Sequence, residues 1–446
     1  MEKRRYGLFT AVTMIVGIVI GSGIFFRSHH ILNYTNGNVA QGILVFCIAA
    51  MAIIFGCLTI DNLAALTDKP GGFITYLDQY VGKRAASAFG WFQCFIYYPT
   101  LSVVISWVVG RFMSLLFGWE LALLGQVLVG FAWFAICFGF NILSGILGGF
   151  FQNFSTIMKI IPLIVIGLLG FIFGNPAEAV FNTGQAVATE ATRFGWIAAI
   201  GPISFSFDGW VISTSVAFEV KDSRKTVPRA MVIAPLCILA LYLLYFIGIS
   251  SYLGPEQVMA LGDDSVYVAA QQLFGTGIAA SAVLMLVVIS VMGTVNGIIL
   301  GYVRIPYSLA LRGMLPGAKW LSKMNDKVNM PINSGIFAMI IALIWWFIHY
   351  FTTYFGILGN SNIADIAIAF GYLLYTVLYV TVIILWRKGV IKGIRKGLLF
   401  PVLATLGALF ILIGGLQNPN FFVFVIICAI SLLGGFFFIR TEKIKK

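Results

Sequence analysis

Long apolar runs separated by short polar connections make up most of this chain. Each run is long enough for a helix to cross the hydrocarbon core of a bilayer, which takes about 20 residues. We predict about twelve spans, at residues 8–32, 38–66, 85–117, 121–141, 153–174, 196–220, 228–252, 278–303, 332–350, 362–386, 398–416 and 421–439. No connection between them is long enough to hold a soluble domain. The pattern therefore predicts an all-α integral membrane protein.

Two of these runs contain a short helix-breaking stretch. Gly21-Ser22-Gly23 interrupts the first run and Phe207-Asp208-Gly209 interrupts the sixth, about 186 positions later. An unpaired backbone amide in contact with lipid costs several kcal/mol, so a break at membrane depth implies surrounding protein or a ligand. Each break lies near the middle of the first span of a five-span block. Because five is odd, the second block enters from the opposite side, which predicts the inverted repeat typical of secondary transporters.

The repeat divides the chain into three parts. Residues 1–174 form the first five-helix repeat, residues 175–396 the second, inverted one, and residues 397–446 two further spans with a cytoplasmic tail. One of the longest connections, residues 253–277, contains an alternating apolar and polar stretch. We predict a short amphipathic helix over residues 257–274 on the outer face, either as a gate or as a passive surface helix.

Composition and charge narrow the class further. Of 446 residues 60% are hydrophobic and only 10% are charged, whereas a soluble protein carries roughly a quarter charged residues. The net charge of +12 would suit a nucleic-acid-binding protein. However, 24 of the 28 Lys and Arg fall on one side of the spans when the N-terminus is placed in the cytoplasm. This bias predicts cytoplasmic N- and C-termini in the cell membrane, with lipid rather than nucleic acid as the partner.

The sequence shows no motif of an enzyme or a metal site. It contains no nucleotide-binding loop, zinc-protease motif or serine-hydrolase motif. Its three His and six scattered Cys have no metal-ligand spacing. A channel is also disfavoured, because no ring of pore-lining charges is apparent. We expect no catalytic residue, no metal and no cofactor.

The first break suits a carboxylate. Each glycine lowers helix stability by roughly 1 kcal/mol, so the backbone can unwind there. A half-helix beginning near Gly23 would present amides that carry a partial positive charge. Close helix packing through small residues is the alternative reading of the two glycines. The matching break in the sixth span favours the ligand site.

Two charged residues lie within spans. Asp208 is near mid-membrane, where a charge costs on the order of 3 kcal/mol; it would hold a proton, pair with a base or cap the second half-helix. Lys159 lies one and a half to two turns into the fifth span from the cytoplasmic side. Its ammonium either bridges helices in place of a coupling cation or snorkels to the interface. Asp61 and Asp365 lie near span ends, and we interpret them as solvated.

Several segments together resemble the amino acid–polyamine–organocation superfamily and, within it, the L-amino acid transporter branch. They are IGSGIF at residues 20–25, KPGGFITY at 69–76, FSFDGW at 205–210, GTVNG at 293–297, Arg304, and LRGMLP at 311–316. The resemblance covers spans one to ten. It implies a LeuT-like 5+5 inverted repeat with broken helices 1 and 6, and transport by alternating access.

The resemblance also implies roles for individual residues. The substrate carboxylate would meet the amides of Gly21, Ser22 and Gly23, and the α-ammonium the carbonyls of Val19, Phe205 and Asp208. Ile24 and Ser206 complete the substrate-binding set, and the Phe205 ring would act as the outer gate. Lys159 would take the place that sodium holds in sodium-coupled relatives. Tyr245 and Asn296 match positions near the site.

Two departures from the family pattern shape the predicted function. The connection at residues 116–121 lacks the cysteine that links animal members to a glycoprotein, so we expect no disulfide-linked heavy subunit and a chain that functions alone. Asp208 stands where animal members often have a small residue, which leaves a proton-coupled mechanism open. The prediction is a sodium-independent exchanger of neutral L-amino acids, with small ones such as alanine, serine and cysteine favoured. A proton-coupled amino acid symporter and a non-transporting amino acid sensor are the alternatives.

Overall fold

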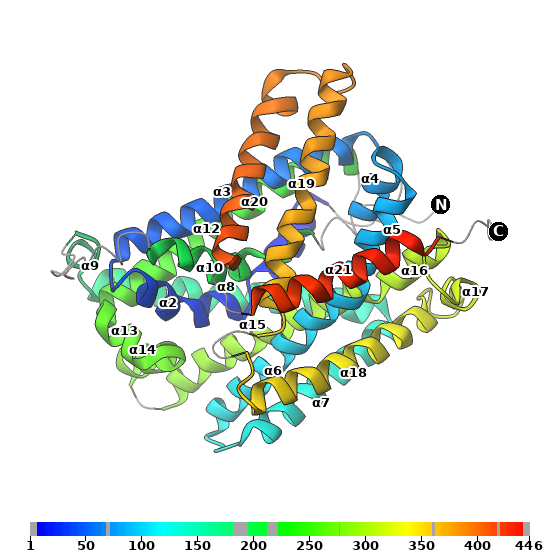
Figure 1. Cartoon of the computed structure of the whole chain (residues 1–446). Coiled ribbons are helices and arrows are strands. Elements are labelled where there is room, and N and C mark those ends of the chain that lie inside the picture. Colours follow the sequence, from blue (N-terminus) through cyan, green and yellow to red (C-terminus); the bar gives the residue numbers. More distant parts are fainter. Residues whose placement is uncertain are drawn as a thin grey trace.

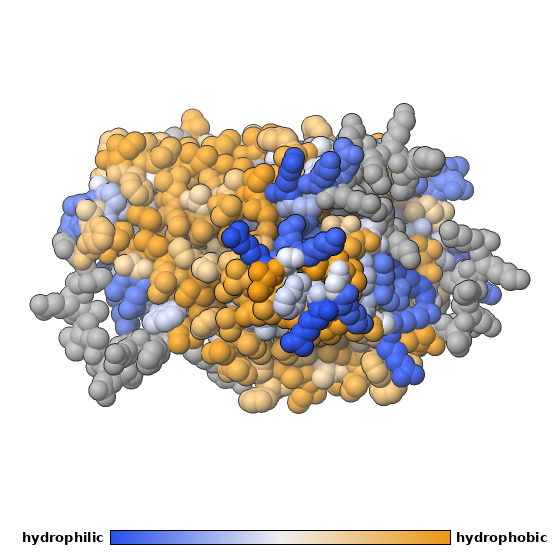
Figure 2. Space-filling model, turned by 90° about the horizontal axis from the view of Figure 1, so that it is seen from above, coloured by the Kyte–Doolittle hydropathy of each residue, from blue (hydrophilic) through white to orange (hydrophobic). Residues whose placement is uncertain are grey.

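The computed structural model describes residues 7–67, 72–181, 195–211, 222–275, 277–358, 362–416 and 420–439. All regular elements in these ranges are helices, as the apolar runs predict. Large apolar side chains are exposed on the outer faces of many of them, and Figure 2 shows the resulting hydrophobic flank. A flank of this kind is stable only against lipid, because water would be ordered around it.

Nine helical stretches in the described ranges are long and apolar enough to cross a membrane. Six are single helices: α3 (Val39–Ala65), α7 (Leu123–Leu143), α8 (Gly145–Phe173), α12 (Ser223–Leu253), α18 (Ile332–Tyr354) and α19 (Asp365–Arg387). Three join consecutive elements: α5 (Lys83–Phe92), η1 (Gln93–Tyr97) and α6 (Tyr98–Phe117); α15 (Ile278–Tyr302) and α16 (Arg304–Leu311); η6 (Arg395–Leu399) and α20 (Phe400–Leu416). The two broken spans and the shorter α21 (Phe421–Phe437) account for the remainder of the twelve predicted.

Both breaks lie where the glycines predict them. α1 (Leu8–Val19) ends at Ile20, whose ψ of 110° is extended, and α2 (Ser22–Tyr34) begins after Gly21. In the sixth span, η3 (Gly195–Ala199) and α10 (Ile200–Phe207) lead into a turn at Asp208. Gly209 has φ of 99°, a conformation that a residue with a Cβ rarely adopts. The continuation of the sixth span from residue 212 lies outside the described residues.

Both broken spans are enclosed by other helices. α1 packs against α8, α12 and α15, whereas α10 packs against α2, α3 and α20. Figure 1 shows most of the long helices running in a common direction, with the hairpin of α19 and α20 crossing them and projecting at the top of the view. The unwound backbone is therefore surrounded by protein rather than lipid, as the bilayer requires.

Short helices gather at two opposite ends of the bundle (Figure 1). One end carries α9 (Pro176–Phe181), α13 (Pro255–Leu261) and α14 (Ser265–Phe274), and the other carries α4 (Gly72–Tyr80) and α17 (Ala318–Leu321). The prediction of one amphipathic helix over residues 257–274 was wrong. Gly262, with φ of 59°, interrupts it in the turn η5 (Gly262–Asp264), so two helices form instead.

Candidate substrate-binding site

A pocket lies between the two broken spans. The cavity is small, about 20 Å³, which is room for a water molecule. Ten residues line it: Ile18, Val19, Gly21, Gly23, Leu101, Ile105, Asp208, Gly209, Thr294 and Ile298. Of the residues predicted to bind substrate, Val19, Gly21, Gly23 and Asp208 are among them. The lining comes from the first, third, sixth and eighth spans.

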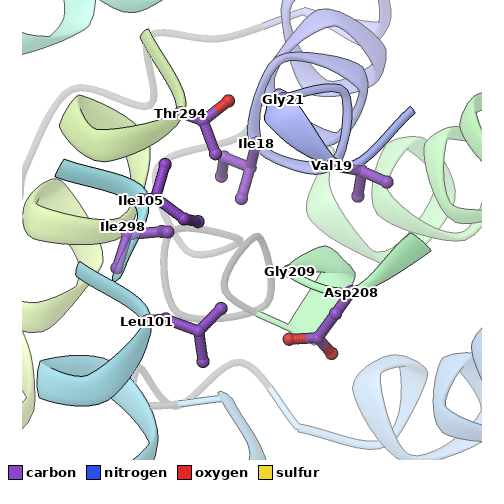
Figure 3. Close-up of a pocket in the computed structure, with 10 residues that line it drawn as sticks. Ile18, Val19, Gly21, Leu101, Ile105, Asp208, Gly209, Thr294 and Ile298 are labelled. Atoms are coloured by element: carbon purple, nitrogen blue, oxygen red, sulfur yellow. The ribbon is translucent and has the colours of Figure 1, made fainter. Parts of the chain in front are cut away.

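The pocket has a polar side and an apolar side. Figure 3 shows Leu101, Ile105 and Ile298 on one side, opposite Val19 and Asp208 on the other. The first amides of α2 have no intrahelical acceptor and carry partial positive charge. The last carbonyls of α1 and α10 carry the opposite partial charge. This arrangement can hold a zwitterion, with its carboxylate and ammonium on backbone groups and an apolar side chain on the wall.

Lys159 stabilises the break in the first span. α8 begins at Gly145 rather than residue 153, so Lys159 lies midway along the helix, and its predicted place near the cytoplasmic end was wrong. The side chain is 0% exposed, and Nζ donates to Gly17 O at 2.5 Å, Ile20 O at 2.7 Å and Thr294 Oγ1 at 3.2 Å. Three acceptors use all the donors of an ammonium, so Lys159 does not snorkel. The ammonium thus satisfies carbonyls that the end of α1 releases.

Thr294 is a site residue that the sequence did not single out. Its hydroxyl lies 3.0 Å from Ile20 O and also accepts from Lys159, so it joins α15 to the same break. A Cβ on Gly21 would lie 2.6 Å from Thr294 Oγ1, which explains why glycine is needed for this close approach. The available signal was its place within the segment at residues 293–297, which carried part of the family resemblance.

Asp208 is paired with a tyrosine rather than a base. Its side chain is 5% exposed, and Oδ2 accepts a hydrogen bond of 2.5 Å from the Tyr97 hydroxyl. Oδ1 has no hydrogen-bond partner in the described part of the chain, and the residue lines the pocket. Tyr97 belongs to the π-helical turn η1, a feature frequent at functional sites. One carboxylate oxygen is therefore held by the protein and the other is left for a donor.

Tyr242 connects the two breaks, whereas Tyr245 does not. The Tyr242 hydroxyl lies 2.7 Å from Ser206 O and 3.4 Å from Val19 O. Tyr245 packs edge-on against Phe25 with ring centroids 5.4 Å apart, and its hydroxyl has no partner within the described ranges. Both tyrosines lie three positions apart on α12, so sequence alone did not distinguish them.

Asn296 lies outside the pocket lining. Its Nδ2 donates to Gly148 O at 2.9 Å and Gln152 Oε1 at 3.0 Å, and its Oδ1 accepts from Asn141 at 2.8 Å. Two positions along a helix turn the side chain by about 200°, so Asn296 faces away from the side that carries Thr294. It ties α15 to α7 and α8 and contributes to the frame of the site.

The remaining predicted residues divide into two groups. Ser206 and Ile24 are buried beside the pocket, and a Cβ on Gly23 would lie 2.7 Å from Ser206 Cα, so α2 and α10 are in direct contact. The side chains of Ser22 and Phe205 lie outside the described part of the structure, and so does the gate predicted at the Phe205 ring. Residues 69–71 of the segment at 69–76 also lie outside it.

Asp365 connects two helices, so the prediction that it is merely solvated was wrong. Its Oδ1 accepts from Arg27 Nη2 at 3.2 Å, and its Oδ2 accepts from the backbone amide of Asn362 at 3.0 Å. The ion pair connects α2 with the start of α19, 338 positions away in the chain. The half-helix that follows the first break is thereby attached to the tenth span.

Comparison with known proteins agrees with this geometry. The chain matches the amino acid permease family model over residues 6–439. It is 28% identical over 416 residues to the serine/threonine exchanger SteT of Bacillus subtilis (strain 168), covering 92% of this chain and 90% of that protein. It is 24% identical to the human cystine/glutamate transporter, covering 70% of this chain and 62% of that protein. It is 26% identical to the human Asc-type amino acid transporter 1, covering 70% of this chain and 60% of that protein.

Proposed function

This chain belongs to the amino acid permease family, and on that premise we propose that it is a sodium-independent exchanger of small neutral L-amino acids. Its relatives are amino acid transporters and exchangers, not enzymes, and its apolar helices make it a multi-pass membrane protein. The finer proposal concerns the substrate and the coupling mechanism.

The observation that carries the proposal is the position of the Lys159 ammonium. It donates to Gly17 O and Ile20 O, the carbonyls released by the break in the first span. In a sodium-coupled mechanism a mobile cation would serve these groups and leave with the substrate. A covalently attached cation remains in place throughout the cycle. Transport then needs no sodium, and a second amino acid supplies the return step.

The substrate proposal rests on the walls of the pocket. Leu101, Ile105 and Ile298 offer apolar contact and no charge to a substrate side chain. The half-helix ends of α1, α2 and α10 offer complementary partial charges to a carboxylate and an ammonium. We propose that the amides of residues 21–23 bind the carboxylate and the carbonyls near Val19 and Asp208 bind the ammonium. Because the cavity between these walls is small, we propose amino acids with small side chains, such as alanine, serine and cysteine.

The transport cycle would expose this pocket alternately to the two sides of the membrane, and the chain would consist of two five-helix repeats, residues 1–174 and 175–396. The N- and C-termini would face the cytoplasm, and the chain would work without a disulfide-linked subunit. The relative SteT, which this chain matches over almost its full length, is a serine/threonine exchanger, and this supports the proposal of an exchange mechanism.

The experiment is uptake of radiolabelled L-serine and L-alanine into proteoliposomes of the purified chain. We expect uptake only when the vesicles are preloaded with unlabelled amino acid, with the same rate in sodium and choline buffers. Empty liposomes loaded in the same way are the control. A requirement for external sodium would refute the proposal.

Proton-coupled symport is the second candidate, because Asp208 has an oxygen without a partner in the pocket. Uptake into amino-acid-free vesicles driven by an inward proton gradient would favour symport over exchange. Saturable binding without flux under all these conditions would instead indicate a sensor.

A further inference from the structure

The turn between α19 and α20, residues 387–396, is a compact structure that the transport mechanism does not use. α19 ends in paired capping hydrogen bonds, from the amides of Gly389 and Val390 to the carbonyls of Trp386 and Leu385 at 2.9 and 3.0 Å. Gly389 and Gly393 have φ of 76° and 89°, which a tight reversal requires. Ile391 is buried and anchors the turn to the protein.

The turn presents a dense positive charge. Five of its ten residues are basic and exposed: Arg387, Lys388, Lys392, Arg395 and Lys396. The sequence contains no Asp or Glu between residues 366 and 439. None of the five forms an ion pair with a residue in the described ranges. The turn therefore carries a net positive charge, which the carboxylate of Asp61 near Lys396 offsets only in part.

Apolar side chains are exposed among these bases. Val390 is 50% and Ile394 is 63% exposed, although both lie in a polar turn. Lys and Arg that only set the orientation of the helices in the membrane need no apolar neighbours, so that role does not explain why Val390 and Ile394 are exposed. The combination of exposed bases with exposed aliphatic side chains is typical of surfaces that contact a membrane at headgroup level.

The flank that leads to the turn is apolar on both helices. Ile384 on α19 and Val402 on α20 are exposed large hydrophobic residues, and they continue the lipid-facing surface up to the turn. Figure 2 looks down on the projecting hairpin of Figure 1 and shows hydrophilic side chains gathered next to the broad hydrophobic flank. The bases thus begin where the exposed apolar side chains of α19 and α20 end.

We propose that the turn at residues 387–396 binds the headgroups of anionic phospholipids, with Lys388, Lys392 and Arg395 contacting the phosphate and Val390 and Ile394 contacting the first acyl carbons. Juxtamembrane Lys and Arg are attracted to anionic lipid, and the attraction sums over neighbouring bases. Arg387 lies in the last turn of α19, near the negative end of its dipole, and completes the basic surface.

The test is lipid retention by the purified full-length protein, measured by native mass spectrometry with added phosphatidylglycerol or phosphatidylcholine. The wild type is expected to retain at least about fivefold more phosphatidylglycerol than phosphatidylcholine. The triple variant Lys388→Gln, Lys392→Gln, Arg395→Gln is expected to retain about tenfold less phosphatidylglycerol than the wild type. The matched control Lys319→Gln, Lys323→Gln, Lys327→Gln removes three exposed bases from another loop and is expected to stay within about twofold of the wild type.

A second variant separates a lipid site from a phosphate site. Val390→Ser, Ile394→Ser keeps every base and removes the apolar contact, so we expect a several-fold loss of phosphatidylglycerol. No loss in this variant, with displacement of lipid by millimolar inorganic phosphate, would assign the site to free phosphate and overturn the proposal. Equal retention of the two lipids by the wild type, or equal losses in the two triple variants, would also overturn it. The readout is binding, so it does not depend on which amino acid is transported.

Discussion

The breaks in the first and sixth spans have a similar place in the fold and opposite chemistry around them. At Ile20 and Gly21, the released carbonyls are met by a buried ammonium and a hydroxyl, from Lys159 and Thr294. At Asp208, a buried acid takes a hydrogen bond from Tyr97 on one oxygen and has none on the other. The carbonyls of the first break at Gly17 and Ile20 are satisfied by the protein itself. The second retains an acceptor that faces the pocket.

This difference assigns different tasks to two related parts of the repeat. A break whose released carbonyls are paired within the protein has a stable arrangement, and its free amides can position a ligand without a change in that arrangement. A buried carboxylate oxygen without a partner is costly, and a ligand donor or a proton relieves that cost. We therefore expect the first break to be the fixed element of the site and the second to respond to substrate. Substitutions at five residues would test this comparison.

Lys159→Ala should have the largest effect. It leaves Gly17 O without its donor and removes one of the two donors to Ile20 O, at a cost of about 1–3 kcal/mol for each group. We expect exchange of L-serine to fall by about two orders of magnitude, since each 1.4 kcal/mol is tenfold. The assay is counterflow in preloaded proteoliposomes, with size-exclusion chromatography to confirm folding. Lys319→Ala, which removes an exposed lysine, is the control. A wild-type rate of exchange in Lys159→Ala would contradict the role proposed for Lys159.

Asp208→Asn should have the next largest effect, mainly on substrate affinity. The amide keeps the volume and an acceptor for Tyr97 but removes the charge that a substrate ammonium would meet, so we expect KM for L-serine to rise about tenfold. Exchange rates at saturating substrate should change less. The surface variant Asp326→Asn is the matched control. If KM is unchanged but proton-gradient-driven uptake disappears, the carboxylate serves coupling and not substrate.

Thr294→Val tests whether the first break is held by more than one donor. The substitution keeps the side-chain shape and removes the hydroxyl near Ile20 O, which is worth about 1 kcal/mol. We expect exchange to slow about fivefold. Thr294→Ser restores the hydroxyl and should exchange at nearly the wild-type rate. Equal rates for the two variants would show that Lys159 holds the break without help.

Tyr242→Phe and Tyr245→Phe form the most sensitive pair. The first removes the hydroxyl that connects Ser206 O with Val19 O, and we expect a loss of exchange of about threefold. The second removes a hydroxyl without a partner in the described residues, and we expect a change of less than twofold. Initial rates of counterflow measured side by side would decide between them. The reverse order would mean that the resemblance located the functional tyrosine better than the geometry did.

Much of the fold was predictable because it depends on local patterns. Bilayer thickness sets the length of each apolar run, so the spans could be counted from hydropathy. Gly21, Gly23 and Gly209 mark the breaks, since a helix tolerates glycine poorly. Local patterns were less reliable where a single residue decides the outcome. Gly262 divided a helix that the pattern predicted as continuous, and α8 began about eight residues earlier than hydropathy indicated.

Residue order alone was enough to predict the membrane class from the apolar runs. It also predicted the two breaks and the presence of Asp208 and Lys159 at membrane depth, because a bilayer penalises each of these departures from an apolar helix. The contacts of each break could not be predicted before the helices were placed in three dimensions. Lys159 reaches Ile20 across 139 positions and Tyr97 reaches Asp208 across 111. Such contacts follow from how whole helices pack and not from neighbouring residues. The same hydropathy is compatible with many packings, whereas a buried donor and its acceptor are paired in only one.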